Sequence, residues 1–264
     1  GFGAMRLCGP HVWGRSKDRA NSTRVLHRAL ELGVNFLDTA DSYGPEVNET
    51  LIAEALHPYP QGLVIGTKGG LVRPNRSTWS EDGRPEHLRR ALDGSLKRLR
   101  LECIDLYQFH APDPKVPFGD SMDALAALQR AGKIRHLGVS NVTVQQLEEA
   151  RRIAPIVAVQ NEYNLDNRSS EDVLTVCEQL GIAFLPWFPL GAKTVLRSVK
   201  VKRIAAQRRV PVAQVALAWL LAQGDDIAPI PGTKRVARVE ENTAADRIEL
   251  RAEQIERLNN LTPA

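Results

Sequence analysis

The sequence has few cysteines and no spacing that would pair them or place them around a metal ion. Cys8, Cys103 and Cys177 are odd in number, widely separated and without a C-x-x-C motif. This pattern argues against a disulfide framework and a structural zinc site. The histidines also lack the paired spacing that a metal-dependent barrel hydrolase would need, and they stand at positions 11, 27, 57, 87, 110 and 136. We therefore expect buried thiols and no metal site.

Long apolar runs are also missing. The longest, residues 212–222, is interrupted by Gln214 and is shorter than the roughly 20 residues of a membrane-spanning helix. No signal peptide is visible at the start of the chain. The sequence therefore predicts a cytoplasmic protein with no membrane partner.

Charge of one sign is nowhere gathered into a block. The net charge is +4, and basic and acidic residues alternate along the 264 positions. The small surplus points to an anionic ligand, but the alternation excludes an extended nucleic-acid surface. With 43% hydrophobic and 25% charged residues, the composition is that of a globular protein. Since α/β barrels of about 200–250 residues form single units, we predict one domain over residues 1–264. We expect a monomer, with an oligomer as the alternative.

Short apolar runs alternate with helical patterns along the whole chain. The runs predict strands at 1–7, 34–40, 63–68, 104–110, 134–140, 157–160, 182–187 and 227–231. Helices are predicted at 22–32, 47–56, 86–100, 119–131, 143–153, 170–180, 236–245 and 252–261, with Pro85 and Thr143 at two starts and Gly181 at one end. The seventh unit is predicted to hold a helical region over 198–222 that includes a second helix. This alternation predicts a closed (β/α)8 TIM barrel of the α/β class. A Rossmann sheet is disfavoured because no G-x-G-x-x-G motif follows a strand.

Four titratable residues fall at the ends of predicted strands. Asp38 and Tyr43 follow the second strand, Lys68 ends the third and His110 ends the fourth. The carboxyl ends of barrel strands meet at one face, so these side chains should converge. A cation would lower the pKa of Tyr43 from about 10, and we expect Lys68 to do so and Asp38 to hold Lys68. His110 would then hold a substrate carbonyl by a hydrogen bond or assist the proton transfer. Taken alone, Lys68 could be a solvated loop lysine, His110 a hydrogen-bonded structural histidine and Tyr43 a rim aromatic. The stretch from Asp38 to Gly44 could likewise be a helix cap at Asp41.

These four residues, inside DTADSYG, IGTKGG and QFHAPD, resemble the catalytic tetrad of the aldo-keto reductase family. Their order and the five-residue step from Asp38 to Tyr43 match, and the resemblance runs from Gly1 to about Leu261. It implies an oxidoreductase that uses NADPH/NADP+ to reduce a small-molecule aldehyde or ketone, with Tyr43 giving the proton. The alternative is a cofactor-binding regulatory subunit with little turnover, as in the potassium-channel β subunits that share the resemblance.

Further positions match the family's cofactor contacts. The amides and hydroxyl of Ser140, Asn141 and Gln160 would bind the nicotinamide amide, and Trp187 would stack on its ring. After the last strand, a basic segment opens a helix, which is a natural phosphate cradle and favours NADPH over NADH. By position, Thr233, Lys234 and Arg238 would meet the 2′-phosphate, and Glu241 and Asn242 the adenine. Asp38, Gly3, Ala4, Met5, Pro189, Leu190, Gly191, Ile230 and Gly232 complete the expected cofactor set.

The sequence departs from the family pattern in three places. Gly232 stands where the aldose-reductase branch has a lysine, and Lys234 is one candidate to take the place of that lysine. The chain starts at the first strand, without the usual N-terminal hairpin, and residues 189–194 are short for a loop that clasps the cofactor. GFGAMRLCGPHVWG and ALHPYP are similar to a bacterial branch that includes pyridoxal reductases. Pyridoxal is therefore the first substrate candidate, with Trp13 and Trp79 as its expected contacts.

Overall fold

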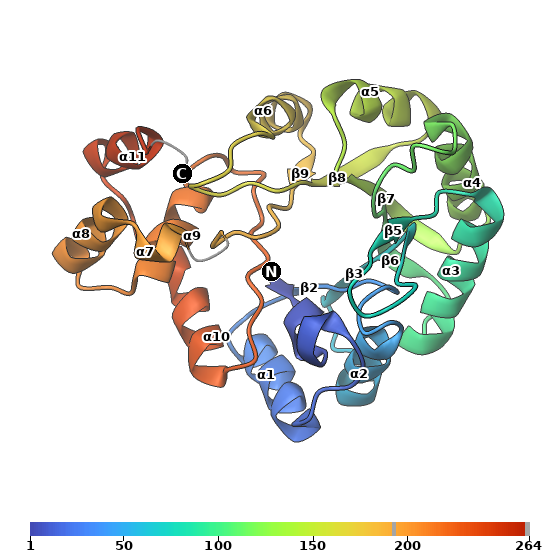
Figure 1. Ribbon diagram of the computed structural model, residues 1–264, viewed down its shortest axis with the longest axis horizontal. Coiled ribbons are helices and arrows are strands. Elements are labelled where there is room, and N and C mark those ends of the chain that lie inside the picture. Colours follow the sequence, from blue (N-terminus) through green and yellow to red (C-terminus); the bar gives the residue numbers. More distant parts are fainter. Residues whose placement is uncertain (192–193, 262–264) are drawn as a thin grey trace.

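Seven parallel strands form one curled sheet, and the helices cover its outer side (Figure 1). The computed structural model describes residues 1–191 and 194–261, so residues 192–193 of the expected cofactor loop and the last three residues of the predicted domain lie outside it. The strand order is β1 (Phe2–Gly3), β2 (Phe36–Asp38), β3 (Val64–Gly69), β6 (Ile104–Phe109), β7 (Ile134–Ser140), β8 (Ile156–Gln160) and β9 (Ala183–Phe184). The helices are α1 (Arg19–Glu31), α2 (Val47–Leu56), α3 (Pro85–Leu99), α4 (Phe118–Arg130), α5 (Val144–Ile153), α6 (Glu171–Leu180), α7 (Thr194–Arg197), α8 (Val199–Arg208), α9 (Val212–Leu221), α10 (Val236–Thr243) and α11 (Ala252–Asn259).

An extended segment, residues 227–231, takes the eighth strand position. The amide of Ala228 donates to the carbonyl of Phe184 at 2.9 Å, and the amide of Gly3 donates to the carbonyl of Pro231 at 3.4 Å. The segment thus joins β9 to β1 and completes the predicted (β/α)8 barrel. The prediction of a regular strand here is wrong, because the prolines at 229 and 231 have no N–H to give to a ladder.

The register of the sheet brings the expected functional residues to one level. Asp38 lies opposite Gly66 of the neighbouring strand, Lys68 lies opposite Gln108, and Ser140 lies opposite Gln160. Because all these strands run parallel, their carboxyl ends open on the same face of the barrel. The apolar residues that precede them pack into the core, which explains why the strands appear as continuous apolar runs.

Several helix boundaries follow the predicted signals. Pro85 is the first residue of α3, Thr143 caps α5 within a capping box, and Gly181 ends α6 with φ 62°. The helical region predicted over 198–222, with a second helix in that unit, is confirmed: it consists of α8 and α9, which are separated at residues 209–211, where Pro211 precedes the first residue of α9. Proline is unfavourable inside a helix but suits a helix start.

The first and seventh predicted strands are too long. The chain leaves the sheet after Gly3 and forms a 3-10 turn over Ala4–Leu7, where Nδ2 of Asn48 donates to the carbonyl of Ala4 at 2.9 Å. The seventh strand is reduced to β9, and Trp187 only forms an isolated bridge with Glu162. Beyond β9, single backbone bonds continue, from the amide of Leu185 to the carbonyl of Val159 at 2.8 Å and from the amide of Trp187 to the carbonyl of Asn161 at 3.1 Å.

A short hairpin after β3 was not predicted. It consists of β4 (Leu71–Val72) and β5 (Ser80–Glu81), which pair antiparallel. At its tip, Oδ1 of Asn75 accepts hydrogen bonds from the amides of Ser77 and Thr78, each at 3.0 Å. These two-residue strands have no apolar run that would reveal them. The hairpin nevertheless matters, because it carries Trp79 to the face where the barrel strands end.

Two negative findings apply to residues 1–191 and 194–261. None of the helices there has both the length and the apolar character needed to cross a bilayer. No three His, Cys, Asp or Glu side chains in that part of the chain are grouped so that they could hold a metal ion.

Candidate active site

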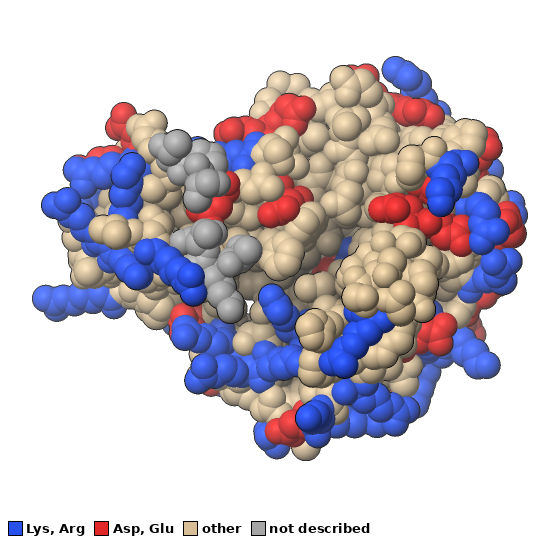
Figure 2. Space-filling model, viewed as in Figure 1, with Lys and Arg blue, Asp and Glu red and all other residues tan. Residues whose placement is uncertain are grey.

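A cavity of about 600 Å³ lies at the carboxyl ends of the strands. Figure 2 shows the centre of this face as a hollow. The cavity brings together the following residues that the sequence singled out: Gly3, Met5, Asp38, Tyr43, Trp79, His110, Ser140, Asn141, Gln160, Trp187, Pro189, Leu190, Gly191, Ile230 and Gly232. Residues from nearly every strand end therefore meet at one place.

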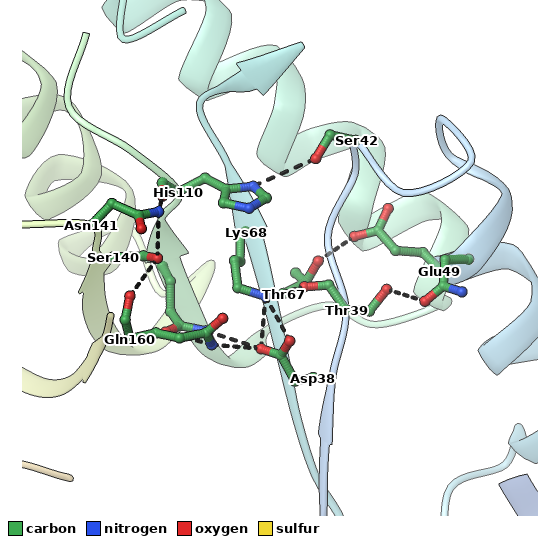
Figure 3. Close-up of polar contacts among 12 residues, drawn as sticks. Asp38, Thr39, Ser42, Glu49, Thr67, Lys68, His110, Ser140, Asn141 and Gln160 are labelled. Atoms are coloured by element: carbon green, nitrogen blue, oxygen red, sulfur yellow. Dashed lines mark hydrogen bonds and ion pairs between the residues drawn. The ribbon is translucent and has the colours of Figure 1, made fainter. Parts of the chain in front are cut away.

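Lys68 and Asp38 form a buried ion pair beneath this cavity (Figure 3). Nζ of Lys68 donates to Oδ1 and Oδ2 of Asp38 at 2.7 and 2.8 Å, and to the carbonyl of Thr39 at 2.9 Å. Nε2 of Gln160 also donates to Oδ1 of Asp38, at 2.8 Å. Lys68 is fully buried and Asp38 is 2% exposed. These hydrogen bonds offset the free-energy cost of removing two charges from water.

Tyr43 and His110 stand beside this pair and face the cavity. Nζ of Lys68 lies 5.2 Å from the centre of the Tyr43 ring. The Tyr43 and His110 rings meet edge to face, with their centres 5.8 Å apart, and each residue is 6% exposed. All four residues that resemble the tetrad therefore converge, with the two rings at the cavity and the ion pair close to them.

The electrostatics of Tyr43 differ from the expectation drawn from the sequence. Burial raises the pKa of Tyr43 well above its usual range, and the Asp38 carboxylate raises this pKa further. Burial also lowers the pKa of the Lys68 ammonium, while Asp38 opposes that shift. The expectation of a lowered pKa for Tyr43 is therefore wrong, because burial and the Asp38 carboxylate shift this pKa upward overall. Tyr43 keeps its proton at neutral pH.

His110 is a neutral ring in this site. Burial lowers its pKa well below its usual value, and the Lys68 cation lowers this pKa further. Nδ1 of His110 lies 3.5 Å from Oγ of Ser42. When Ser42 donates this hydrogen bond, the ring proton is on Nε2, which can donate to an oxygen in the cavity. The Asn141 amide holds the His110 backbone through its carbonyl, at 2.9 Å.

The amide-binding positions are linked to one another. Oγ of Ser140 donates to the carbonyl of Gln160 at 2.7 Å and accepts from Nδ2 of Asn141 at 3.1 Å. Oδ1 of Asn141 accepts from Nε1 of Trp187 at 3.0 Å. This chain of hydrogen bonds fixes the Trp187 ring at the wall of the cavity, next to polar groups that suit a planar carboxamide ligand.

The expected phosphate-binding side chains do not line this cavity. The ammonium of Lys234 donates to the carbonyl of Cys8 at 2.7 Å, and the hydroxyl of Thr233 accepts from the amide of Arg235 at 3.1 Å. Arg238 is paired with Glu241. Asn242 lines a separate cavity, while Ala4 and Trp13 also lie outside the wall of the main one. These residues stand beside the site rather than in it.

A second buried charge supports the strand that carries Lys68. Oγ1 of Thr67 donates to Glu49 at 2.6 Å, and Nε of Arg98 donates to the other oxygen of Glu49 at 2.6 Å. Glu49 is fully buried.

Nearby, burial and the charge of Glu49 raise the pKa of Asp41 well above its usual value. Asp41 does not cap α2, since the cap residue Glu46 precedes that helix with no side-chain cap bond, so the capping explanation is wrong.

Sequence reasoning missed several residues of the cavity wall: Arg6, Val12, Leu71, Phe188, Leu196 and Pro231. Most of them lie in loops or turns, where no periodic pattern marks the face that a side chain covers. Leu71 belongs to the hairpin that the sequence did not reveal. Phe188 and Pro231 are flanked in the chain by residues that the sequence did single out, and this adjacency was the only sign that they line the cavity.

Comparisons with known proteins agree with this geometry. The sequence matches the aldo/keto reductase family over residues 1–262. It is 45% identical over 260 residues to an uncharacterised oxidoreductase of Schizosaccharomyces pombe, covering 98% of this chain and 85% of that protein. It is 41% identical over 268 residues to pyridoxine 4-dehydrogenase of Escherichia coli, covering 99% of this chain and 94% of that enzyme.

The structure is also similar to solved structures of the same kind. A crystal structure of an aldo-keto reductase from Klebsiella pneumoniae in complex with NADPH superposes with a TM-score of 0.85 at 25% identity, covering 100% of this chain and 90% of that one. The chain belongs to the aldo/keto reductase family.

Proposed function

We propose that this protein reduces the carbonyl group of a small aldehyde or ketone with NADPH. The observation that supports this most is the buried Lys68–Asp38 pair next to Tyr43 and His110 at a cavity of about 600 Å³. A proton donor, a hydrogen-bond donor and a balancing charge are what carbonyl reduction needs from a protein. The protein works as a single-domain monomer in the cytoplasm.

The residues present fit a nicotinamide cofactor. Ser140, Asn141 and Gln160 offer amide and hydroxyl groups at the wall of the cavity, and Trp187 offers a ring face held by its hydrogen bond to Asn141. Figure 2 shows Lys and Arg side chains gathered over α1, α8 and α10, beside the hollow. A positive rim of this kind attracts a ligand that carries several phosphate charges. Thr233, Lys234 and Arg238 lie at the start of α10 and would meet the 2′-phosphate.

When bound, NADPH supplies the hydride that reduces the carbonyl carbon. Tyr43 and Nε2 of His110 donate hydrogen bonds to the carbonyl oxygen and favour the negative charge that develops there. Tyr43 then transfers its proton to that oxygen. The tyrosinate that remains is stabilised by the Lys68 cation, 5.2 Å from the ring centre. Asp38 keeps Lys68 in place through two hydrogen bonds.

Pyridoxal is the substrate that the sequence favours. The relative from Escherichia coli is named pyridoxine 4-dehydrogenase, and the two chains are 41% identical. Trp79 lines the cavity and meets the Tyr43 ring edge to face, with the ring centres 6.3 Å apart. An aromatic wall next to the proton donor suits an aldehyde carried on a planar ring.

Replacing Tyr43 with Phe tests the assignment of the proton donor. Tyr43→Phe should lower turnover by roughly 10²- to 10⁴-fold, because only the acid is lost. The dissociation constant for NADPH should change little. Oxidation of NADPH with pyridoxal, followed by its absorbance, measures this. Tyr59→Phe is the control, since the Tyr59 hydroxyl donates to the carbonyl of Leu99 away from the cavity. Near-normal turnover in Tyr43→Phe would refute the assignment.

The pH dependence of reduction follows from two pKa shifts. Tyr43 must be protonated to act, and its raised pKa keeps the proton in place as the pH rises. His110 has a lowered pKa, so its ring stays neutral as the pH falls. We expect kcat/KM to remain flat between about pH 6 and 8, without an inflection near the ordinary histidine pKa of about 6.5. A profile at constant ionic strength measures this. A loss of activity with an apparent pKa near that value would show that His110 titrates in the working range.

Replacing Arg238 with Ala tests the choice of cofactor. The Arg238 side chain is 48% exposed, and its exposed pair with Glu241 contributes little stability, so the guanidinium is available to a phosphate. Arg238→Ala should weaken NADPH binding by about 1.5–3 kcal/mol and leave NADH binding unchanged. Fluorescence quenching measures both dissociation constants, with Arg152→Ala on α5 as the control for lost surface charge. Equal losses for the two cofactors would exclude a role for Arg238 at the 2′-phosphate.

A further inference from the structure

Arg73 lies behind the wall of the cavity, directly after β4, and is 7% exposed. It donates hydrogen bonds to backbone carbonyls of two separate segments. Nη2 and Nη1 reach the carbonyls of His11 at 3.2 Å and Val12 at 3.1 Å. On the other side, Nη2 and Nε reach the carbonyls of Arg76 at 2.6 Å and Thr78 at 3.1 Å. One guanidinium therefore joins the loop after β1 to the tip of the β4–β5 hairpin.

The same guanidinium contacts two aromatic rings. Its central carbon lies 3.9 Å from the centre of the Trp79 ring and 5.4 Å from the centre of the Trp13 ring. Both distances are within the range of an attractive cation–π contact. Trp13 belongs to the loop and Trp79 to the hairpin, so the ring contacts link the same two segments as the hydrogen bonds do.

The loop that Arg73 holds has a strained backbone. His11 and Val12 have φ angles of 59° and 56°, a region that a β-branched residue such as Val rarely adopts. Such a conformation persists only where the surroundings enforce it. The carbonyls of these two residues are the ones that Arg73 binds, and the Val12 carbonyl also accepts from the amide of Gly44 at 3.2 Å. Arg73 and Gly44 therefore hold the strained turn in place.

The segments that Arg73 joins form part of the site. Val12 and Trp79 both line the cavity together with Tyr43. The Trp79 and Tyr43 rings meet edge to face, and Gly44 follows Tyr43 directly in the chain. The position of this wall relative to the proton donor therefore depends on contacts that Arg73 makes.

We propose that Arg73 is a positioning residue that determines substrate specificity. It fixes Val12 and Trp79 as a rigid wall beside Tyr43, and this wall selects carbonyl compounds that carry a planar ring. Such a ring has a face that can pack on Trp79, whereas a short aliphatic carbonyl compound is too small to use the wall. The proposal rests on the proposed function, in which Tyr43 is the group that reacts with the carbonyl.

The test compares a ring-bearing aldehyde with a short one. Arg73→Met retains the apolar stem and removes every donor of the guanidinium. It should lower kcat/KM for benzaldehyde about tenfold or more, through KM, and change kcat/KM for propanal by less than about threefold. The dissociation constant for NADPH should stay the same. Arg73→Lys should restore only part of the loss, because an ammonium lacks the planar fork that reaches both segments.

Arg76→Met is the matched control, because the Arg76 side chain is exposed on the same hairpin. Equal losses for benzaldehyde and propanal, or no loss for either, would overturn the proposal. If Arg73→Met does not fold, the losses in kcat/KM for benzaldehyde and propanal are compared in Arg73→Lys instead.

A binding measurement separates this proposal from the proposed function. Benzamide and propanamide are unreactive analogues of the two aldehydes, and calorimetry with the NADP+-saturated protein gives their affinities. Arg73→Met should weaken benzamide binding about tenfold and leave that of propanamide unchanged. If the wild-type protein reduced neither aldehyde, the proposed function would fail, and the benzamide affinities would still decide the role of Arg73. Unchanged benzamide affinity would overturn that role.

Discussion

The contact between the ammonium of Lys68 and the carboxylate of Asp38 is the interaction on which the site depends. Each charge alone would be costly to bury, and removing either partner leaves the other uncompensated. The bonds to Thr39 and Gln160 complete the hydrogen bonding of the pair. Asp38, Lys68 and Gln160 come from β2, β3 and β8, so their contacts also fix how the ends of these strands meet. The arrangement of Tyr43 and His110 follows from that geometry.

The charges around Tyr43 explain its protonation state. In the resting protein, Asp38 offsets the Lys68 cation, and burial keeps the tyrosine protonated. The contribution of Lys68 is to stabilise the negative charge that remains on Tyr43 when its proton has left, 5.2 Å from the ring centre. The site is thus arranged for charge that develops during the reaction rather than for charge already present, which is the more effective use of a buried cation.

The strand ends were predictable from the sequence because apolar runs that stop at a polar residue mark the exit of a buried strand. This placed Asp38, Lys68 and His110 at one face, and the structure confirms that they converge. The role of Arg73 was not predictable, since it depends on contacts with two loops that no local sequence pattern connects. The same limit applies to Lys234, whose ammonium binds the distant carbonyl of Cys8. Long-range contacts of surface loops, rather than the barrel, are what the sequence left open.

A double-mutant cycle on the buried pair tests the account most directly. Asp38→Asn, Lys68→Met and the combined variant are compared with the wild type by kcat/KM for NADPH-dependent reduction of pyridoxal. If the two side chains act as one unit, the combined variant should lose about as much activity as the worse single variant. Losses that multiply across the two sites, or a single variant with near-normal activity, would contradict the claim that the site depends on this pair.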